Sequence, residues 1–288
     1  NVMCMACNVN LFKESGVALP PPDVSKPWTW EEFVTALTRL TAQIAQLTEL
    51  LGLEKTGKTD LESQLAQLRA TLATAETDAA VRCVLIQGDP TIFSAGNDIG
   101  DFLNAPPATQ ESPVFRFLRG IATFPKPLVA SVCGPAVGIG TTMLFHCDLV
   151  YAGDNAAFSM PFVNLGLCPE AASSLLVPQM LGYHRAAEAL LLGEPFMAEA
   201  ALEVGLVNRV VPPTEANAIA QAQARKLAAK PLSALVETKR LLKKGQMPAV
   251  LERMGEEGAS FGRMLREPAA REAFSAFMEK RKPDFSKC

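Results

Sequence analysis

Short runs of apolar and β-branched residues, alternating with helix-compatible stretches, constrain the fold of this chain more than any other feature. The alternation starts at Arg82, and glycine or proline bounds each run. Four runs are predicted strands, at residues 82–87, 128–133, 148–152 and 206–211. A strand followed by a turn and a helix is the repeating unit of parallel sheets, so the sequence predicts an α/β fold.

The two ends of the chain differ from this alternating region. After the last predicted strand, residues 214–229, 232–244 and 248–281 are almost entirely helix-like. Before the alternating region, a proline cluster leads to Thr29 and Glu32, whose spacing suits a helix-capping box. Leucines then recur every three or four residues, as in an amphipathic helix. We therefore expect an atypical N-terminal appendage of loop plus helix at 1–58. One domain should follow at 59–288, with C-terminal helices from about 214.

Charge and hydropathy exclude several classes of partner. The formal net charge is -3 and no block of Lys and Arg occurs, which argues against nucleic acid and anionic lipid. No apolar run reaches the roughly 18 residues that a membrane-spanning helix needs, and the N-terminus lacks the layout of a signal peptide. A cytoplasmic location is the corresponding expectation.

The cysteines predict neither a disulfide framework nor a metal site. There are seven of them, an odd number, scattered through a chain long enough to fold without cross-links. Cys4 and Cys7 form a CxxC pair, but zinc needs two further ligands, and His146 and His184 lie far along the chain in apolar helical contexts. We expect no metal, and we expect His146 to be a satisfied core or interface histidine.

The stretch GLEKTGKT at residues 52–59 matches the phosphate-binding loop pattern GxxxxGK[ST]. A working loop of this kind follows a buried strand, so that backbone amides and a helix N-terminus converge on phosphate. Here an amphipathic helix precedes it. A turn between two helices is the favoured interpretation, and nucleotide binding is the alternative.

Two glycine-rich turns each follow a predicted strand. The first, FSAGND at 93–98, has small residues that let a ligand approach the main chain and could leave the Asn97 amide pointing outward. The second, GPAVGIGTT at 134–142, enters a predicted helix at 141–145, and such a helix opening presents free backbone amides. Facing each other, two such amides would form an oxyanion hole. Taken singly, a plain turn or close helix–strand packing explains each motif.

Four motifs in order resemble the crotonase (enoyl-CoA hydratase/isomerase) superfamily over about residues 62–245: FSAGNDIGDF, KPLVASVCGPAVGIGTTMLFHCDLVYA, FSMPFVNLGLCPEAASSLLVPQMLG and LLLGEPFMAEAALEVGLVNRVVP. The resemblance implies a crotonase-like ββα spiral that binds acyl-CoA thioesters. It also implies an enolate held by the amides of Asn97 and Ile139. The implied substrate-binding residues are Ala95, Gly96, Asp98, Gly138, Phe162 and Leu165.

The acid–base residues distinguish members of this superfamily. Hydratases carry one glutamate two residues after the last glycine of GGG and another in the following Pro-Glu, but here those positions hold Thr142 and Phe162. Glu170, in PFVNLGLCPEAASS, instead resembles the catalytic base of the peroxisomal-type Δ3,Δ2-enoyl-CoA isomerases. Apolar neighbours should desolvate this carboxyl and strengthen it as a base. A helix N-terminal acid that pairs with the helix dipole is the alternative role for Glu170.

The resemblance therefore implies an isomerase that shifts a 3-enoyl-CoA double bond to the 2-position, with no cofactor besides the CoA of its substrate. It also implies a homotrimer or hexamer. Two alternatives stay open: a crotonase-fold acyl-CoA-binding or assembly protein with little catalysis, and another crotonase reaction such as hydration. Lys239 and Arg240 are expected on a solvated basic face, with contact to CoA phosphates as the alternative. The segment that usually shapes the adenine pocket of the family has no counterpart before residue 61.

Overall fold

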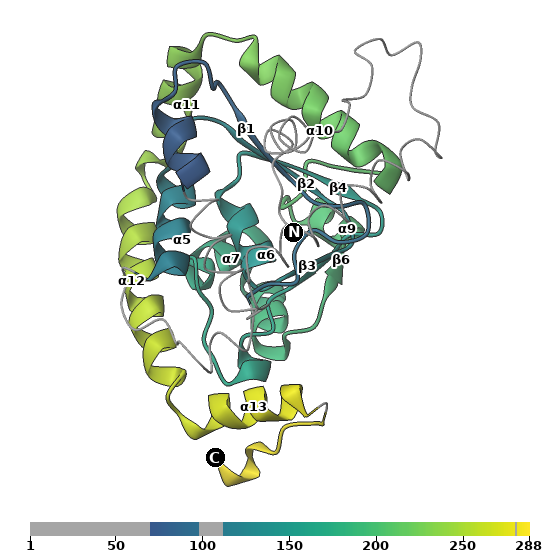
Figure 1. Cartoon of the computed structure of the whole chain (residues 1–288), viewed down its shortest axis with the longest axis vertical. Coiled ribbons are helices and arrows are strands. Elements are labelled where there is room, and N and C mark those ends of the chain that lie inside the picture. The colour runs from purple at the N-terminus through teal and green to yellow at the C-terminus, as the bar shows by residue number, and fades with distance from the viewer. Residues whose placement is uncertain (1–69, 98–111, 280) are drawn as a thin grey trace, which may run out of the picture. The chain divides into compact units, whose positions relative to one another are not determined.

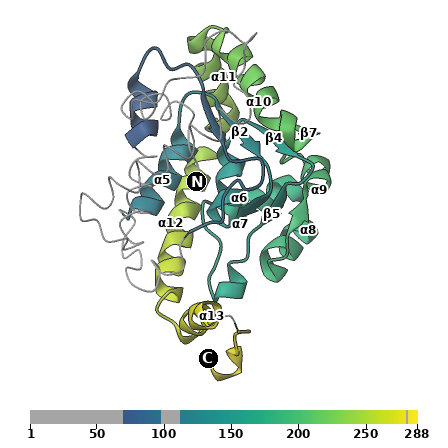
Figure 2. The ribbon, with the colours of Figure 1, turned by 45° about the vertical axis from the view of Figure 1, so that its right-hand side comes forward.

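Two β-sheets organise the part of the chain that the computed structural model describes, namely residues 70–97, 112–279 and 281–288. The larger sheet has the strand order β1-β2-β4-β7 and the smaller has the order β3-β5-β6. Figures 1 and 2 together label these strands. The strands are β1 (Val84–Gln87), β2 (Leu128–Val132), β3 (Pro135–Val137), β4 (Leu149–Gly153), β5 (Ala157–Ser159), β6 (Phe196–Met197) and β7 (Arg209–Val211).

All four predicted strands are present, and they form the larger sheet in parallel pairs. Val84 lies opposite Leu128, Val129 opposite Leu149, and Tyr151 opposite Arg209. The inner strand β2 is buried along its whole length, as a parallel strand covered on both faces must be. The predicted α/β fold is therefore confirmed.

The smaller sheet was not predicted. Strand β3 pairs with β5 in parallel and β5 pairs with β6 antiparallel, but these strands are only three, three and two residues long. Periodicity cannot be read over so few residues, and β3 lies inside the glycine-rich turn.

Helices cover both faces of the larger sheet. They are α5 (Pro113–Thr123), α6 (Ile139–Thr142), α7 (Ser173–Leu181), α8 (Tyr183–Ala187), α9 (Ala198–Glu203), α10 (Pro213–Ala228), α11 (Leu232–Lys244), α12 (Met247–Met264) and α13 (Pro268–Met278). Shorter helical turns are η1 (Met143–His146), η2 (Val163–Leu165), η3 (Glu188–Leu192) and η4 (Phe285–Lys287). A further helical stretch occupies residues 70–77.

The period-two alternation of the strands divides the core between the two faces. Helix α10 lies against one face of the larger sheet (Figure 2). On that face Val129 and Tyr151 cluster with Ala220 of α10. Their neighbours Ala130 and Val150 belong to the larger core on the other face, together with α5 and the segments that carry the glycine turns. The site described below is built over this larger core.

The predicted C-terminal helical region is confirmed, with one break. The run expected at 248–281 divides into α12 and α13, because Pro268 takes the first helical position of α13, where its missing N–H costs nothing. Helix α12 runs beside α5 (Figure 1) and also contacts α7. The helix predicted at 141–145, after the second glycine-rich turn, is less regular than expected. It consists of the short helix α6 followed by the 3₁₀ turn η1.

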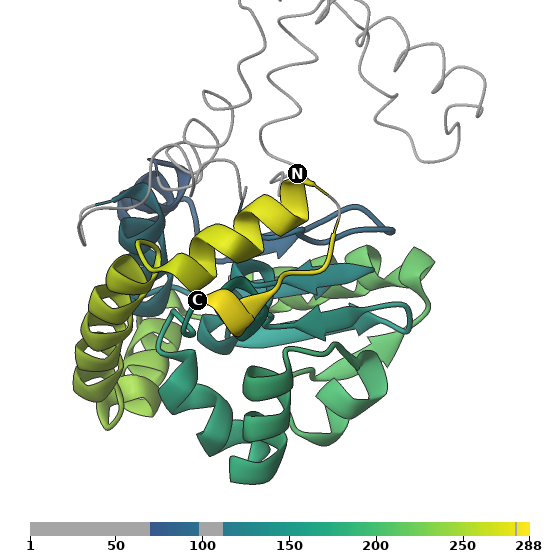
Figure 3. The ribbon, with the colours of Figure 1, turned by 90° about the horizontal axis from the view of Figure 1, so that it is seen from below.

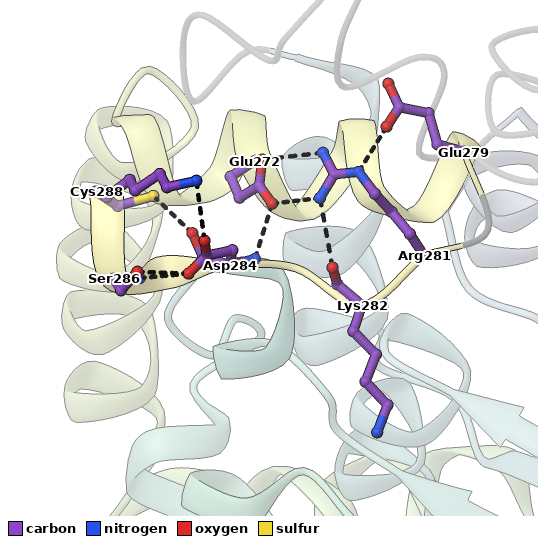
Figure 4. Close-up of polar contacts among 8 residues, drawn as sticks. Glu272, Glu279, Arg281, Lys282, Asp284, Ser286 and Cys288 are labelled. Carbon is purple, nitrogen blue, oxygen red and sulfur yellow. Dashed lines mark hydrogen bonds and ion pairs between the residues drawn. The ribbon is translucent and has the colours of Figure 1, made fainter.

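The C-terminal tail folds back along α13 (Figure 3). Arg281 forms ion pairs with Glu272 of α13 and with Glu279, and the Glu272 carboxylate also accepts a hydrogen bond of 2.8 Å from the Asp284 amide (Figure 4). These bonds lower the pKa of Glu272 to about 2. The tail is thus attached through exposed charge-assisted contacts.

The predicted appendage at 1–58, its boundary with the following domain, the Cys4–Cys7 pair and the candidate phosphate loop at 52–59 all lie outside the described residues. The division into two parts therefore stays a prediction. Across 70–97, 112–279 and 281–288, no helix has the length and apolar character that crossing a membrane requires.

Candidate active site

The two predicted glycine turns lie next to each other. The amides of Phe93 and Ser94 both donate to the Pro135 carbonyl, at 3.1 and 3.0 Å, and the Val137 amide donates to the Ser94 carbonyl at 2.9 Å. Gly96 has φ +88°, and a Cβ on it would lie 3.0 Å from the Val137 carbonyl oxygen. A Cβ there would require the Val137 carbonyl to shift by a few tenths of an ångström, and φ +88° is unfavourable for a residue with a Cβ, so glycine suits this close approach.

Ile139 is placed at the opening of α6, where backbone amides are free. It is the first residue of that helix, so its N–H has no intrahelical acceptor. The preceding Gly138 has φ +56° and ψ −118°, a conformation that glycine adopts readily and residues with a Cβ rarely do, and its own amide donates to the Ser159 carbonyl at 2.9 Å. The bend at Gly138 thus sets the direction of the Ile139 N–H.

The other predicted residues of the turns vary in exposure. Asn97 and Gly96 are half-buried and Ala95 is exposed, so this turn is open to a ligand. Asp98 lies outside the described residues. The roles of Asn97 and Ile139 as oxyanion donors stay predictions, although the segments that carry them are neighbours.

Glu170 is buried, with 4% of its surface exposed. Its Oε1 accepts a 2.5 Å hydrogen bond from the hydroxyl of Thr142, at the end of α6. Among the described residues, its Oε2 is the one buried side-chain oxygen or nitrogen without a hydrogen-bond partner. Glu170 is therefore fixed by one oxygen and leaves the other available for chemistry.

Burial decides the protonation of Glu170. Desolvation raises the pKa of this carboxyl from 4.5 to about 8, the Thr142 hydrogen bond opposes the rise, and the negative charge of Glu257 adds to it. The desolvation expected from the sequence is thus confirmed. A carboxyl with a pKa near neutrality can both accept and return a proton at physiological pH.

The backbone after Glu170 is strained and held from several sides. Ala171 and Ala172 both have left-handed φ angles, of 61° and 57°. The Ala171 carbonyl lies 2.8 Å from Nε2 of His146, and the Glu170 carbonyl accepts bonds from the amide and hydroxyl of Ser173. Left-handed residues with a Cβ are uncommon and concentrate at functional sites.

His146 is a satisfied buried histidine, as expected. It is 3% exposed, and desolvation lowers its pKa to about 4. Because it is neutral at physiological pH and faces a backbone carbonyl, it supports the Ala171 turn.

Phe162 precedes η2, the turn that leads towards Glu170, and Leu165 is its last residue. Phe162 is buried, Leu165 is half-buried, and both pack in the larger core. The Leu167 amide donates to the Phe162 carbonyl at 2.9 Å and closes this turn. Both residues belong to the apolar setting of the site, and their contact with substrate stays a prediction.

Lys239 corrects one expectation. It is 6% exposed rather than on a solvated face, and its Nζ forms a 2.6 Å ion pair with Asp148 and donates to the Lys126 carbonyl at 2.8 Å. Its ammonium group is therefore engaged within the fold. Arg240 is half-exposed and pairs with Glu237, as a solvated face predicts.

Sequence reasoning missed two residues of the site. Thr142 stood out only as the replacement for a hydratase glutamate, yet it donates the hydrogen bond to Glu170. Glu257 of α12 lies 85 and 83 positions from the amides that it contacts, so no local pattern could reveal it. No cluster of three or more potential metal ligands occurs within the described ranges.

Comparison with known proteins identifies the family. The profile described as "Enoyl-CoA hydratase/isomerase" matches residues 61–287. A probable enoyl-CoA hydratase of Bacillus subtilis (strain 168) is 33% identical over 228 residues, covering 77% of this chain and 88% of that protein. Enoyl-CoA delta isomerase 2 of Rattus norvegicus is 44% identical over 147 residues, covering 49% of this chain and 37% of that protein.

A solved structure agrees with these sequence matches. OdaA of Pseudomonas aeruginosa is 47% identical, with a TM-score of 0.74, over 75% of this chain and 88% of that one. The profile match includes Glu170 and the two glycine turns, and the relative from Bacillus subtilis and OdaA each cover about three quarters of this chain. The chain therefore belongs to the crotonase, or enoyl-CoA hydratase/isomerase, family of acyl-CoA enzymes.

Proposed function

We propose that this protein is a Δ3,Δ2-enoyl-CoA isomerase, in which Glu170 transfers a proton between two carbons of the acyl chain. The observation that carries the proposal is the buried Glu170 carboxyl, whose Oε2 has no hydrogen-bond partner among the described residues and whose pKa is about 8. Thr142 joins this carboxyl to the second of the two adjoining glycine turns. Cofactors other than the CoA moiety of the substrate are not needed for this reaction.

The steps follow from this arrangement. The ionised Oε2 of Glu170 takes a proton from C2 of a 3-enoyl-CoA, and the electron pair moves into the thioester to give a dienolate. The amides of Asn97 and Ile139 stabilise the negative oxygen, a contribution of about 10²- to 10³-fold per donor. Protonated Glu170 then returns the proton to C4, which leaves the double bond between C2 and C3. No water is consumed.

Two features favour isomerisation over hydration. Hydration requires water to be positioned and activated, a task the hydratase pattern gives to two carboxylates, whereas Thr142 and Phe162 occupy those positions here. The other buried glutamate of the described chain, Glu257, is fully engaged by backbone amides. The resemblance to enoyl-CoA delta isomerase 2 supports the same choice, although the relative from Bacillus subtilis is named a hydratase.

The test is turnover of 3-hexenoyl-CoA by the purified protein, compared with hydration of 2-hexenoyl-CoA. We expect isomerisation to dominate and the Glu170→Gln variant to lose about 10²- to 10⁴-fold in kcat. Hydration faster than isomerisation would replace the proposal with a hydratase. Acyl-CoA binding without turnover would favour a binding or assembly protein, and equal rates for parent and variant would contradict the mechanism.

A further inference from the structure

Glu257 of α12 reaches across to the strained turn that follows Glu170. Its Oε2 accepts a 2.6 Å hydrogen bond from the Ala172 amide, and its Oε1 accepts a 2.9 Å bond from the Ser174 amide. The side chain is 6% exposed, so both oxygens are used inside the protein. Desolvation raises the pKa of Glu257, and the bonds from Ser174 and Ala172 and the charge of Arg253 oppose the rise.

This contact replaces a cap that the local sequence lacks. Ala172 is the N-cap residue of α7, but an alanine side chain cannot accept a hydrogen bond from the first turn. Glu257 supplies the missing acceptor from another helix. Its negative charge also lies at the positive end of α7, where it is favourable.

The same contact holds the turn that aims Glu170. Two successive alanines in the left-handed region cost about 1–2 kcal/mol each, so they persist only where neighbours fix them. Glu257 fixes this pair by binding the amide of its second residue, and His146 contacts the carbonyl of its first. Glu170 immediately precedes the pair.

We propose that Glu257 is a positioning residue, which orients the Glu170 carboxyl by clamping the Ala171–Ala172 turn from α12. This inference rests on the proposed function of Glu170. Glu257 itself does not contact the reacting atoms. The charge of Glu257 is one of the causes that raise the pKa of Glu170.

The groups around the pair set the pH dependence. From α12 come Glu257 and Arg253, which also donates to the Ser174 hydroxyl at 3.1 Å. Cys168, on the segment before Glu170, has a raised pKa of about 11 and stays neutral, and His146 of η1 is neutral above about pH 4. Within this set, Glu170 has a pKa of about 8, and Glu257 supplies the carboxylate charge that the variants below remove or keep.

Two variants separate charge from position. Glu257→Gln keeps the length of the side chain but removes the charge and turns an NH₂ group towards one of the amides. Glu257→Asp keeps the charge but shortens the side chain. Glu256→Gln is the matched control, since Glu256 is the adjacent residue of α12, is exposed, and pairs with Arg253 at the surface.

Steady-state isomerase kinetics from pH 5 to 9 provide the main readout, with folding of every variant checked by thermal melting. For both Glu257 variants we expect kcat to fall by about ten- to a hundredfold, with little change in KM, because the base is misplaced. The acidic limb of the kcat profile should move to lower pH in Glu257→Gln and stay near that of the parent in Glu257→Asp. Glu256→Gln should match the parent throughout.

The inference would be overturned if both Glu257 variants kept the kcat of the parent and the position of the acidic limb of its pH profile. A lower melting temperature with no change in these kinetic quantities would have the same consequence. The pKa of Glu170 is also measured directly by infrared spectroscopy of the carboxyl group during a pH titration. For the parent and for each Glu257 variant, the spectrum of the same protein carrying Glu170→Gln is subtracted, so that only the Glu170 signal remains. A lower Glu170 pKa in Glu257→Gln supports the inference even if the parent does not isomerise 3-hexenoyl-CoA, a result that would refute only the proposed function. An unshifted pKa counts against the inference.

Discussion

At the scale of single residues, Glu170 combines catalytic potential with a cost to stability. Its pKa is raised from 4.5 to about 8 in the folded protein, so the folded state binds this proton more tightly than the unfolded chain does. The resulting stabilisation is fully present below pH 4.5 and is lost as the pH rises through about 8. The ionised base needed for chemistry is thus the less stable form of the protein.

Replacement of Glu170 by glutamine should therefore stabilise the protein increasingly as the pH rises. Between pH 5 and 9, we expect the free energy of unfolding of Glu170→Gln to gain about 4 kcal/mol on that of the parent, because one pKa unit corresponds to about 1.4 kcal/mol and part of the shift is already expressed below pH 5. Urea unfolding at several pH values measures this margin, with Glu256→Gln as control. A margin that is the same at pH 5 and pH 9 would show that burial does not perturb this carboxyl.

Thr142 should tune the base that it contacts. The Thr142 hydroxyl donates to Oε1 of Glu170, and this bond lowers the pKa of the carboxyl. Thr142→Val removes the hydroxyl, so the Glu170 pKa should rise and the acidic limb of the pH profile of kcat should move to higher pH. The neighbouring Thr141→Val is the matched control. Its hydroxyl bonds the Ala136 carbonyl and the Ser159 amide instead, so it should lose stability without moving the limb. Equal limbs in both variants would contradict the assigned contact.

The functional role of a residue could be predicted from the sequence where the residue lies in a recognisable motif. It could not be predicted where the role depends on groups that folding brings together from distant parts of the chain. Glu170 and the glycines of the two turns are recognisable because they lie in ordered motifs. The left-handed Ala171 and Ala172 are not, since alanine is a residue that rarely adopts this conformation. Glu257 comes from α12 and becomes relevant only once that helix packs against α7.

At the scale of elements, sequence reasoning succeeds for buried strands and long helices. The four strands of the larger sheet have apolar runs bounded by breakers, and α10 and α11 occupy almost the ranges expected. The three-residue strands β3 and β5 depend on contacts instead, such as the isolated bridge between Ser94 and Ala136. Those contacts are the ones that bring the two glycine turns together.

Gly138 links the second turn to α6, and its replacement should separate backbone conformation from crowding. A Cβ at this position would meet no atom within 4 Å, so the expected loss of about 1–3 kcal/mol in Gly138→Ala arises from φ +56° and ψ −118° alone. If relaxation turns the Ile139 amide away, kcat should fall by up to about 10²- to 10³-fold.

Gly120→Ala is the control for this variant. Gly120 lies inside α5, a Cβ there would also meet no atom within 4 Å, and its φ is not in the left-handed region. We expect it to stabilise the protein by about 0.5–1 kcal/mol without changing kcat. Thermal melting and steady-state kinetics on both variants make the comparison. Parent-like kcat in a destabilised Gly138→Ala would remove Ile139 from the proposed oxyanion hole.

At the scale of the whole molecule, a chain of polar contacts joins the C-terminal helices to the larger sheet. Lys239 of α11 pairs with Asp148, whose carboxylate also accepts a 2.7 Å bond from the amide of Leu128 at the start of β2. Lys239 further donates to the carbonyl of Lys126, and the Lys126 ammonium donates to the carbonyls of Ala75 and Asp78. Lys239 of α11 thus joins two segments that lie more than 90 positions before it in the sequence, one at Lys126 and one at Asp148.

Lys239→Met should therefore weaken the fold without altering the chemistry. Removing one partner of a buried ion pair leaves an uncompensated charge, and we expect the free energy of unfolding to fall by about 3–5 kcal/mol. The Asp148→Asn and Lys239→Met/Asp148→Asn variants complete a double-mutant cycle, in which the double variant should lose less than the sum of the single ones.

The acidic limb of the kcat profile provides the contrast with the site. Lys239 lies among Asp148, Lys126 and Phe124 rather than in the turn around Glu170, so its loss should leave the limb where the parent has it. Additive single losses would show that the pair is too solvated to matter. A raised KM for acyl-CoA with parent-like stability would instead return Lys239 to the binding surface, a role that its burial argues against.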